Sequence, residues 1–431
     1  MAREMARHPE TEPNPQIGRQ EPQMRRHNPR CAPATEGKSA RSAGSFRVLL
    51  LGVIAGAWTV AALLPVSPSE GSSDQAAPPR LADTGLYADF AVGQIDLANR
   101  PYEPQYPLWS DGAAKRRWFY LPPGTTIDAS DPDDWAFPVG TKFWKEFSFG
   151  ARAETRYMEL RPGGVWVYAT YAWNEDGTDA VLAPERGIAR FREIPGGAGA
   201  RHDIPGLYDC KACHEGRPNR VLGFGALQLS PDRDPLAPHA VEPGPDAVDL
   251  AVLARDGLLE GLPARYLTHA PRIAAVSPRE RAALGYLHAN CGGCHNQVGP
   301  LASVGLSLDV ALEDPDGDPR AIRTAVDQDS RYRGQAPGSA AAPRIARGRP
   351  QESVLVARMS TREPTSQMPP LGTHLADEQA VALVTGWIRE DLLARESRVL
   401  TPASPPSASV PASASVPAPA SAPAIVSTAR R

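Results

Sequence analysis

Two copies of one short motif constrain this chain more than any other feature. Four of the five cysteines lie in the pattern Cys-x-x-Cys-His, at Cys210, Cys213 and His214 and again at Cys291, Cys294 and His295. This pattern is the attachment motif for c-type haem: the two thiols bond to the two vinyl groups of one porphyrin, and the histidine that follows becomes an iron ligand. We therefore expect two covalently bound haem c groups as cofactors, with His214 and His295 as proximal metal ligands.

Two other uses of paired cysteines compete with this interpretation. Four thiols can hold a structural zinc ion, but that use leaves both histidines without a role, and the two pairs are too far apart for a compact zinc ribbon. A thioredoxin-like redox pair needs a βαβ setting. Neither Asp209-Cys210 nor Asn290-Cys291 follows a strand-like run. Haem attachment accounts for all six motif residues.

The N-terminal region predicts export. Residues 1–47 are polar, Pro-rich and basic, and residues 48–64 form an uncharged apolar run that ends at Pro65. Positive charge before an apolar run keeps the N-terminus in the cytoplasm and sends the following chain across the membrane. Residues 48–64 are a cleaved signal or an inner-membrane anchor, slightly shorter than the roughly 20 residues of a full span. We expect a cytoplasmic leader, with Cys31 as an idle thiol, and a periplasmic remainder that is tethered if the segment is retained.

Composition marks two further segments and excludes one class of partner. Residues 65–80 read as a flexible linker, and residues 397–431 as a disordered Ala/Ser/Pro tail that cannot bury enough apolar surface to fold. The net charge of −3 gives no basis for nucleic-acid binding.

Residues 81–200 are expected to form an all-β, sandwich-like domain. Aromatic and β-branched runs bounded by Gly- and Pro-containing turns lie at 116–121, 142–149, 155–160 and 165–173. Short runs with regular turn signals are typical of a β-sandwich or barrel. Six of the eight tryptophans lie in this stretch, and alternating aromatics in strands favour a core over a carbohydrate-binding surface.

Residues 201–396 are expected to form an all-α, cytochrome c-type region that carries both haems. Helical periodicity is found at 247–257, 277–290, 353–359 and 377–393. Ser277 at the N-cap, Pro278 at the first helical position and Glu280 at the third form a capping box. The predicted fold class is therefore multidomain α+β, with a β-rich domain followed by an all-α haem region.

Met368 is the candidate sixth ligand of the second haem. It lies in a proline-flanked loop before the terminal helix, and a thioether ligand raises the potential of haem iron. His374 is the local alternative. For the first haem several candidates stay open, as does an empty sixth position; the candidates are Met158, His202, His239, His269 and His288.

The chain from about residue 81 to 393 resembles a family of exported bacterial dihaem c-type cytochromes. The strings that carry the resemblance are Pro107-Leu-Trp-Ser-Asp-Gly-Ala-Ala-Lys115, Trp135-Ala-Phe-Pro-Val-Gly-Thr141, Glu154-Thr-Arg156, Trp173-Asn-Glu-Asp-Gly-Thr-Asp-Ala180, the first haem motif with Leu222-Gly-Phe224 and Gln228-Leu229, Tyr286-Leu-His-Ala-Asn-Cys-Gly-Gly-Cys-His295 and Met368-Pro-Pro-Leu-Gly372. The resemblance implies haem at both motifs and Met368 as an axial ligand, and it implies no substrate.

Three functions compete on the sequence. The leading one is transfer of single electrons in the periplasm between an exported donor and a respiratory acceptor, with redox proteins as partners and the inner membrane as a further contact if the anchor is retained. The alternative is a dihaem peroxidase with one five-coordinate iron, for which Glu215 and Arg217 are the nearby polar candidates. A third makes the β-rich domain a ligand-binding module. We expect a carrier more than a catalyst, and assign no catalytic residue.

Overall fold

The computed structural model describes residues 76–314, 318–332 and 342–395. The predicted leader (1–47), apolar segment (48–64), tail (397–431) and all but the last residues of the linker lie outside these ranges. Of that linker, residues 76–80 are described, and Arg80 bridges Val181. No helix within the described ranges has the length and apolar character needed to cross a membrane.

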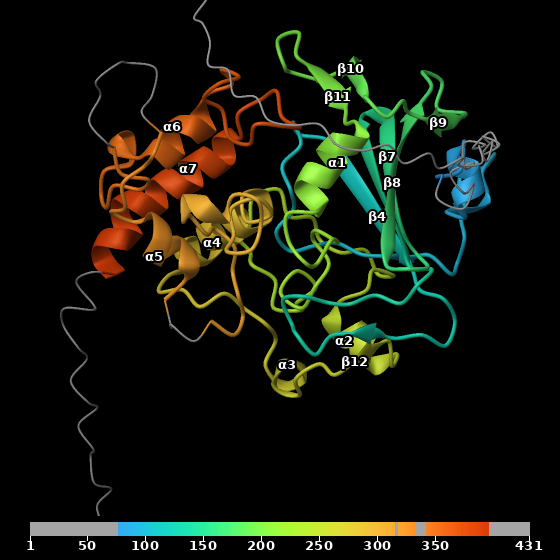
Figure 1. Cartoon of the computed structure of the whole chain (residues 1–431), viewed down its shortest axis with the longest axis horizontal. Coiled ribbons are helices and arrows are strands. Elements are labelled where there is room, and N and C mark those ends of the chain that lie inside the picture. The colour runs from blue at the N-terminus through green and yellow to red at the C-terminus, as the bar shows by residue number, and fades with distance from the viewer. Residues whose placement is uncertain (1–75, 315–317, 333–341, 396–431) are drawn as a thin grey trace, which may run out of the picture. The chain divides into compact units, whose positions relative to one another are not determined.

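A six-stranded antiparallel sheet is the largest element (Figure 1). Its strands follow the order β3-β4-β6-β7-β8-β9, with bounds β3 Arg100–Pro101, β4 Ala114–Tyr120, β6 Lys142–Phe149, β7 Ala151–Arg161, β8 Val165–Trp173 and β9 Ala180–Leu182. The four runs predicted as strands are the four long strands of this sheet. The smaller pairs are β1 Tyr87–Asp89 with β2 Gln94–Ile95, β10 Ile188–Glu193 with β11 Arg201–Ile204, and β5 Ile127–Asp128 with β12 Leu259–Glu260.

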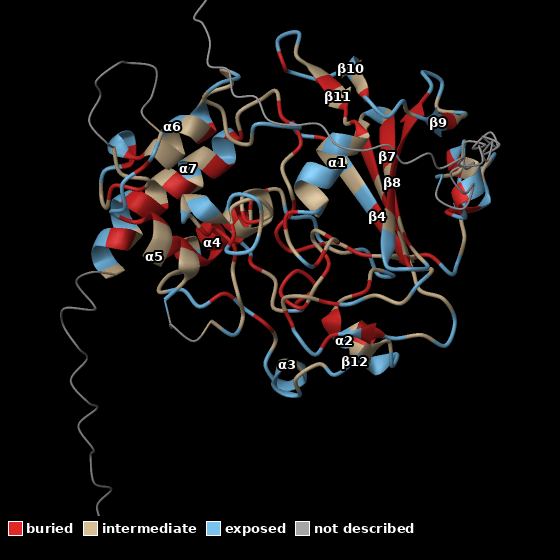
Figure 2. Ribbon diagram, in the orientation of Figure 1, coloured by how far each residue is buried: buried red, intermediate tan, exposed pale blue. Residues whose placement is uncertain are grey.

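Each face of the sheet buries its own core, because alternate side chains of a strand point to opposite faces. One face carries Trp144, Tyr157 and Trp173 and packs against Leu81 and Leu86. The other face carries aromatic and apolar side chains that pack against residues beyond position 200, namely Phe119, Phe143, Met158 and Tyr168 against Phe224 and Leu250. The prediction that the aromatic runs form a core is confirmed (Figure 2).

The helices are short. Their bounds are α1 Leu207–His214, α2 Leu250–Arg255, α3 Arg265–Thr268, α4 Pro278–Asn290, α5 Arg320–Ala325, α6 Val354–Ser360 and α7 Glu378–Gly386, and α7 continues into a π-helical turn, Trp387–Asp391. Helix α4 begins at the predicted N-cap, because the Glu280 N–H donates to Ser277 Oγ at 3.0 Å. The second half of the predicted capping box differs: Glu280 Oε1 accepts from the N–H of Val276, at 3.0 Å, rather than from that of Ser277. Helices α4, α5, α6 and α7 share a third core, which centres on Leu284, Leu287 and Trp387.

The predicted fold class is wrong: the β-rich part is not a sandwich, and the haem region is not all-α. The large sheet is not one layer of a sandwich, since α1 and irregular chain cover one of its faces and the segment around 81–95 covers the other. Residues 201–396 are not all-α: they contribute strands β11 and β12, and α2 and α3 span only 6 and 4 residues. Six prolines between His214 and Leu250 keep that stretch irregular, because proline removes a backbone donor and breaks a helix.

Candidate functional site

One cavity brings the predicted site residues together. It measures about 840 Å³ and lies between the face of the sheet covered by α1 and the helices α4 and α6. All seven residues singled out from the sequence line it: Cys210, Cys213, His214, Cys291, Cys294, His295 and Met368. Its volume is at the upper end of ligand pockets, which run from about 300 to 1,000 Å³.

Helix α1 carries the first motif and packs against β8. It starts at Gly206, whose N–H donates to Asp209 Oδ2 at 2.9 Å. The ring of His214, the last residue of the helix, lies 5.4 Å from the ring of Tyr168 on β8. The His214 Nδ1–H donates to the carbonyl of Arg220 at 2.7 Å. Because Nδ1 carries the proton, Nε2 keeps its lone pair, which is the arrangement of a metal-ligating histidine. Burial lowers the pKa of His214 to about 4, so the ring is neutral.

The second motif follows the C-terminus of α4. The N–H of His295 donates to the Cys291 carbonyl at 2.8 Å, and the His295 carbonyl accepts from the Leu308 N–H at 2.8 Å. Burial lowers the pKa of His295. Its Nδ1 is buried and has no hydrogen-bond partner among the described residues. A buried polar atom without a partner is uncommon in a folded protein.

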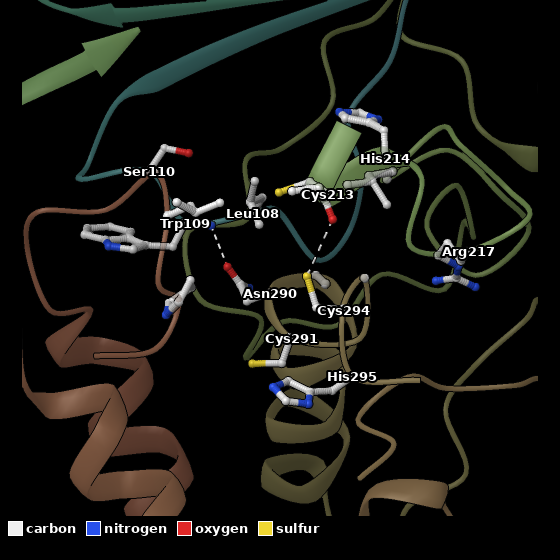
Figure 3. A pocket seen from close by; sticks show the side chains of 18 of the residues that line it. Leu108, Trp109, Ser110, Cys213, His214, Arg217, Asn290, Cys291, Cys294 and His295 are labelled. Carbon is white, nitrogen blue, oxygen red and sulfur yellow. Dashed lines mark hydrogen bonds between the residues drawn. The ribbon is translucent and has the colours of Figure 1, made fainter. Parts of the chain in front are cut away.

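The two motifs touch each other. Asn296 Nδ2 donates to the carbonyls of Gly216 and Gly293, at 3.1 and 3.2 Å, and Cys294 Sγ lies 3.9 Å from the Ala212 carbonyl oxygen. A Cβ on Gly216 would lie 2.4 Å from the Gly293 oxygen, so only glycine permits this approach. Figure 3 shows Cys213 and Cys294 between the two histidines.

The four thiols are free and suit a covalent attachment better than a redox pair. None of them is in a disulfide. Burial is the main cause that raises the pKa of all four, to about 12 at Cys291, whereas redox-active pairs need a lowered pKa. In the described part of the chain no three His, Cys, Asp or Glu side chains converge on a common metal position.

A clamp from the strand-rich half holds the second motif and the Met368 loop. We use "clamp" for residues 107–111. The Trp109 N–H donates to Asn290 Oδ1 at 2.7 Å (Figure 3). The indole N–H of Trp109 donates to the Leu375 carbonyl at 3.2 Å. Asp111 Oδ1 accepts from the N–H groups of His374 and Leu375, both at 2.8 Å. The loop therefore takes its position from residues more than 250 positions earlier in the chain.

The structure separates the candidate sixth ligands. His202, His239 and His374 are paired with Glu154, Asp377 and Asp203, and His269 is exposed beside Thr268. These four do not line the cavity, whereas Met158 and His288 do.

His288 differs from His214 in its tautomer. The Val310 N–H donates to His288 Nδ1 at 3.0 Å, so the proton of the neutral ring lies on Nε2. That nitrogen has no lone pair for iron. Met158, on β7, is thus the remaining candidate that lines the cavity.

The sequence reasoning missed the basic residues of the cavity. Arg117, Lys145 and Arg156 line it beside the first motif. Burial, followed by neighbouring cations, holds the pKa of Lys145 well below its usual value. The alternation within the strand runs put these three on the same face as Phe119, Phe143 and Met158, so the strand pattern was the available signal. Of the two polar residues considered for catalysis, Arg217 lines the cavity, whereas Glu215 is exposed and pairs with Arg220 at 3.4 Å.

Comparison of the chain with protein-family models, with curated proteins and with solved structures finds no match.

The residues present fit haem groups attached at both motifs. Free thiols line the cavity, His214 has an available Nε2, and the thioether of Met368 lines the same space as His295. The cationic side chains of the cavity, which match carboxylates, agree with this fit.

Proposed function

We propose that this protein is a periplasmic dihaem c-type cytochrome that carries single electrons between an exported donor and a respiratory acceptor. The observation that carries the proposal is the convergence of both Cys-x-x-Cys-His motifs and Met368 on one cavity. The two motifs are 81 positions apart when counted from Cys210 to Cys291, and nothing in their spacing requires them to meet.

Specific residues would bind each haem. Cys210 and Cys213 would bind the first haem and Cys291 and Cys294 the second, each as thioethers, with His214 and His295 as proximal ligands and Met368 as the sixth ligand of the second iron. Bound haem supplies one-electron exchange between the ferrous and ferric states. Burial lowers the pKa of both histidines, and the Arg220 carbonyl fixes the His214 ring.

The contact between the motifs supports a relay. Cys294 Sγ and the Ala212 carbonyl are 3.9 Å apart, so groups attached at the two motifs would adjoin. An electron that enters at one group then has a neighbour to move to. Redox proteins are the proposed partners, and residues 48–64 would add a membrane tether if they are retained.

The resemblance to exported dihaem cytochromes supports the same proposal and suggests a role for the clamp. Several of the strings that carry the resemblance lie at the cavity or hold it, including the stretch that contains the clamp and the Met368 loop. The strand-rich half would then serve to position ligands.

Electron paramagnetic resonance of the oxidised protein, produced with haem-attachment machinery, tests the proposal. We expect two low-spin ferric signals, because a carrier has two six-coordinate irons. One high-spin signal beside one low-spin signal would instead favour the peroxidase-type enzyme, for which Arg217 and the Nε2–H of His288 supply polar groups at the cavity. Absence of any haem signal would refute both.

A further inference from the structure

Three cations stand side by side on the cavity face of the sheet. Arg117 on β4 is opposite Lys145 on β6, and Lys145 is opposite Arg156 on β7. We call these three residues the cationic row. Directly opposed residues in an antiparallel sheet have Cβ atoms about 5 Å apart, and like charges in that position destabilise the sheet. The row therefore costs folding free energy unless an anion neutralises it.

The described carboxylates form ion pairs only with the two ends of the row. Arg117 pairs with Glu103. Arg156 donates from Nε and Nη2 to Glu154 Oε1, at 3.0 and 2.6 Å, and Glu154 also binds His202 Nε2 at 3.0 Å. Glu154 is fully buried, so it holds the Arg156 guanidinium in place.

Lys145, in the middle, has no such partner. Among the described residues its Nζ forms no hydrogen bond or ion pair, and the Phe147 ring centroid lies 4.9 Å away. The fourth cation nearby, Lys115, adds to the repulsion at Lys145. Lys145 is half-buried and lines the cavity, and three cations, Arg117, Lys115 and Arg156, oppose the attraction that Glu154 exerts on it. An ammonium that lacks a directly bonded counter-ion is costly in such a place. An anion in the cavity can therefore reach the Lys145 ammonium.

The cationic row lies beside the first motif. Arg156, Cys210 and Cys213 line the same cavity, and α1 packs against β8, the strand next to β7 (Figure 1). An anionic substituent on a group attached at those cysteines is therefore within the same part of the cavity.

We propose that the cationic row binds a carboxylate carried by the occupant of the cavity, with Lys145 as its main contact and Arg156 as the second. This deepens the proposed function, on which it rests, because each haem carries two propionates. A propionate of the first haem and a free carboxylate are the two sources of the same chemistry.

The test uses the full-length haem-loaded chain and the variant Lys145→Met, which keeps the length of the side chain and removes its charge. The matched control is Lys142→Met on the same strand, whose Nζ contacts the Thr84 carbonyl on the other face. Redox titration of both haems from pH 5 to 8 is the readout. We expect Lys145→Met to lower the potential of one haem at pH 8, because loss of a nearby cation stabilises the ferric form. We also expect a new pH dependence in that haem, because a carboxyl without its cation has a raised pKa. Lys142→Met should behave as the wild type.

Acetate separates the two sources. If a free carboxylate occupies the row, acetate should raise the melting temperature of the wild type more than chloride does, and Lys145→Met should abolish the difference. If a propionate occupies it, acetate should have no such effect. The proposal fails if Lys145→Met shows neither the new pH dependence nor a lost acetate response. A wild-type chain without attached haem would refute the proposed function. The acetate response would then show whether the cationic row binds a carboxylate independently of haem.

Discussion

Two histidines of one cavity differ in the atom that carries their proton. The Arg220 carbonyl can only accept, so His214 Nδ1 must donate to it; the Val310 N–H can only donate, so His288 Nδ1 must accept. A metal needs a nitrogen lone pair, and the backbone partner therefore selects His214 and excludes Nε2 of His288. Both backbone partners, Arg220 and Val310, lie outside the Cys-x-x-Cys-His motifs.

We propose Met158 as the sixth ligand of the first haem iron. We expect Met158→Leu to fold, because a swap between these side chains usually costs less than about 1.5 kcal/mol. With the thioether gone, one haem should change from low-spin to high-spin in the oxidised protein, as measured by electron paramagnetic resonance. An unchanged pair of low-spin signals would remove Met158 from the ligand set.

Met368 has the corresponding role at the second iron. Met368→Ala should leave both haems attached and lower the potential of one of them, because a methionine ligand stabilises ferrous iron. Redox titration measures the shift. Met359→Leu is the control, since Met359 is a buried core residue of α6. The axial assignment is wrong if Met368→Ala keeps the wild-type potential.

At the scale of elements, the clamp joins the strand-rich half to the Met368 loop. The Asp111 carboxylate is buried and accepts two backbone N–H groups of the Met368 loop. Asp111 has a φ of 52°, a left-handed conformation that Asp and Asn tolerate better than other side chains.

Asp111→Ala should therefore loosen the loop. Leaving buried N–H groups unpaired costs about 1–3 kcal/mol each, and we expect a lower melting temperature together with a high-spin fraction at the second haem. Asp111→Asn, which keeps an acceptor and the left-handed turn, should restore most of both properties. Equal loss in the two variants would show that the carboxylate does not act through these bonds.

The contact between the two motifs leads to a second prediction at the scale of elements. Gly216→Ala places a Cβ against the Gly293 carbonyl, a backbone atom that cannot move cheaply. We expect a loss of about 1–3 kcal/mol in the free energy of unfolding, as for other overpacked sites, and a smaller interaction between the two haem potentials. Gly244→Ala, which meets open space, is the control for both measurements.

At the scale of the whole molecule, the sheet and the helices form one site. Residues 102–168 and 221–253 share a core beneath the first motif. Replacing Cys210 and Cys213 together by Ala should halve the covalently bound haem, as measured by the pyridine haemochrome assay and intact mass. Full haem content in this double variant would show that the first motif is not an attachment site.

The sequence alone determined the local features. Strand runs such as 142–149, the cap at Ser277 and the seven candidate site residues follow from side-chain alternation, capping chemistry and short-range spacing, which act within a few residues. The predictions of a sandwich and of an all-α region were wrong, because the segment that covers a sheet face is determined by contacts between residues far apart in the sequence. Here α1 and proline-rich chain beyond residue 200 cover one face.

Tertiary structure decided which of these residues meet. The cationic row, the clamp on the Met368 loop and the tautomer of His288 all depend on partners more distant in the chain. No short window of sequence contains both members of such a pair. The motifs predict which chemical groups the site contains. Packing brings these groups into one cavity, because apolar faces from distant segments are buried together away from water.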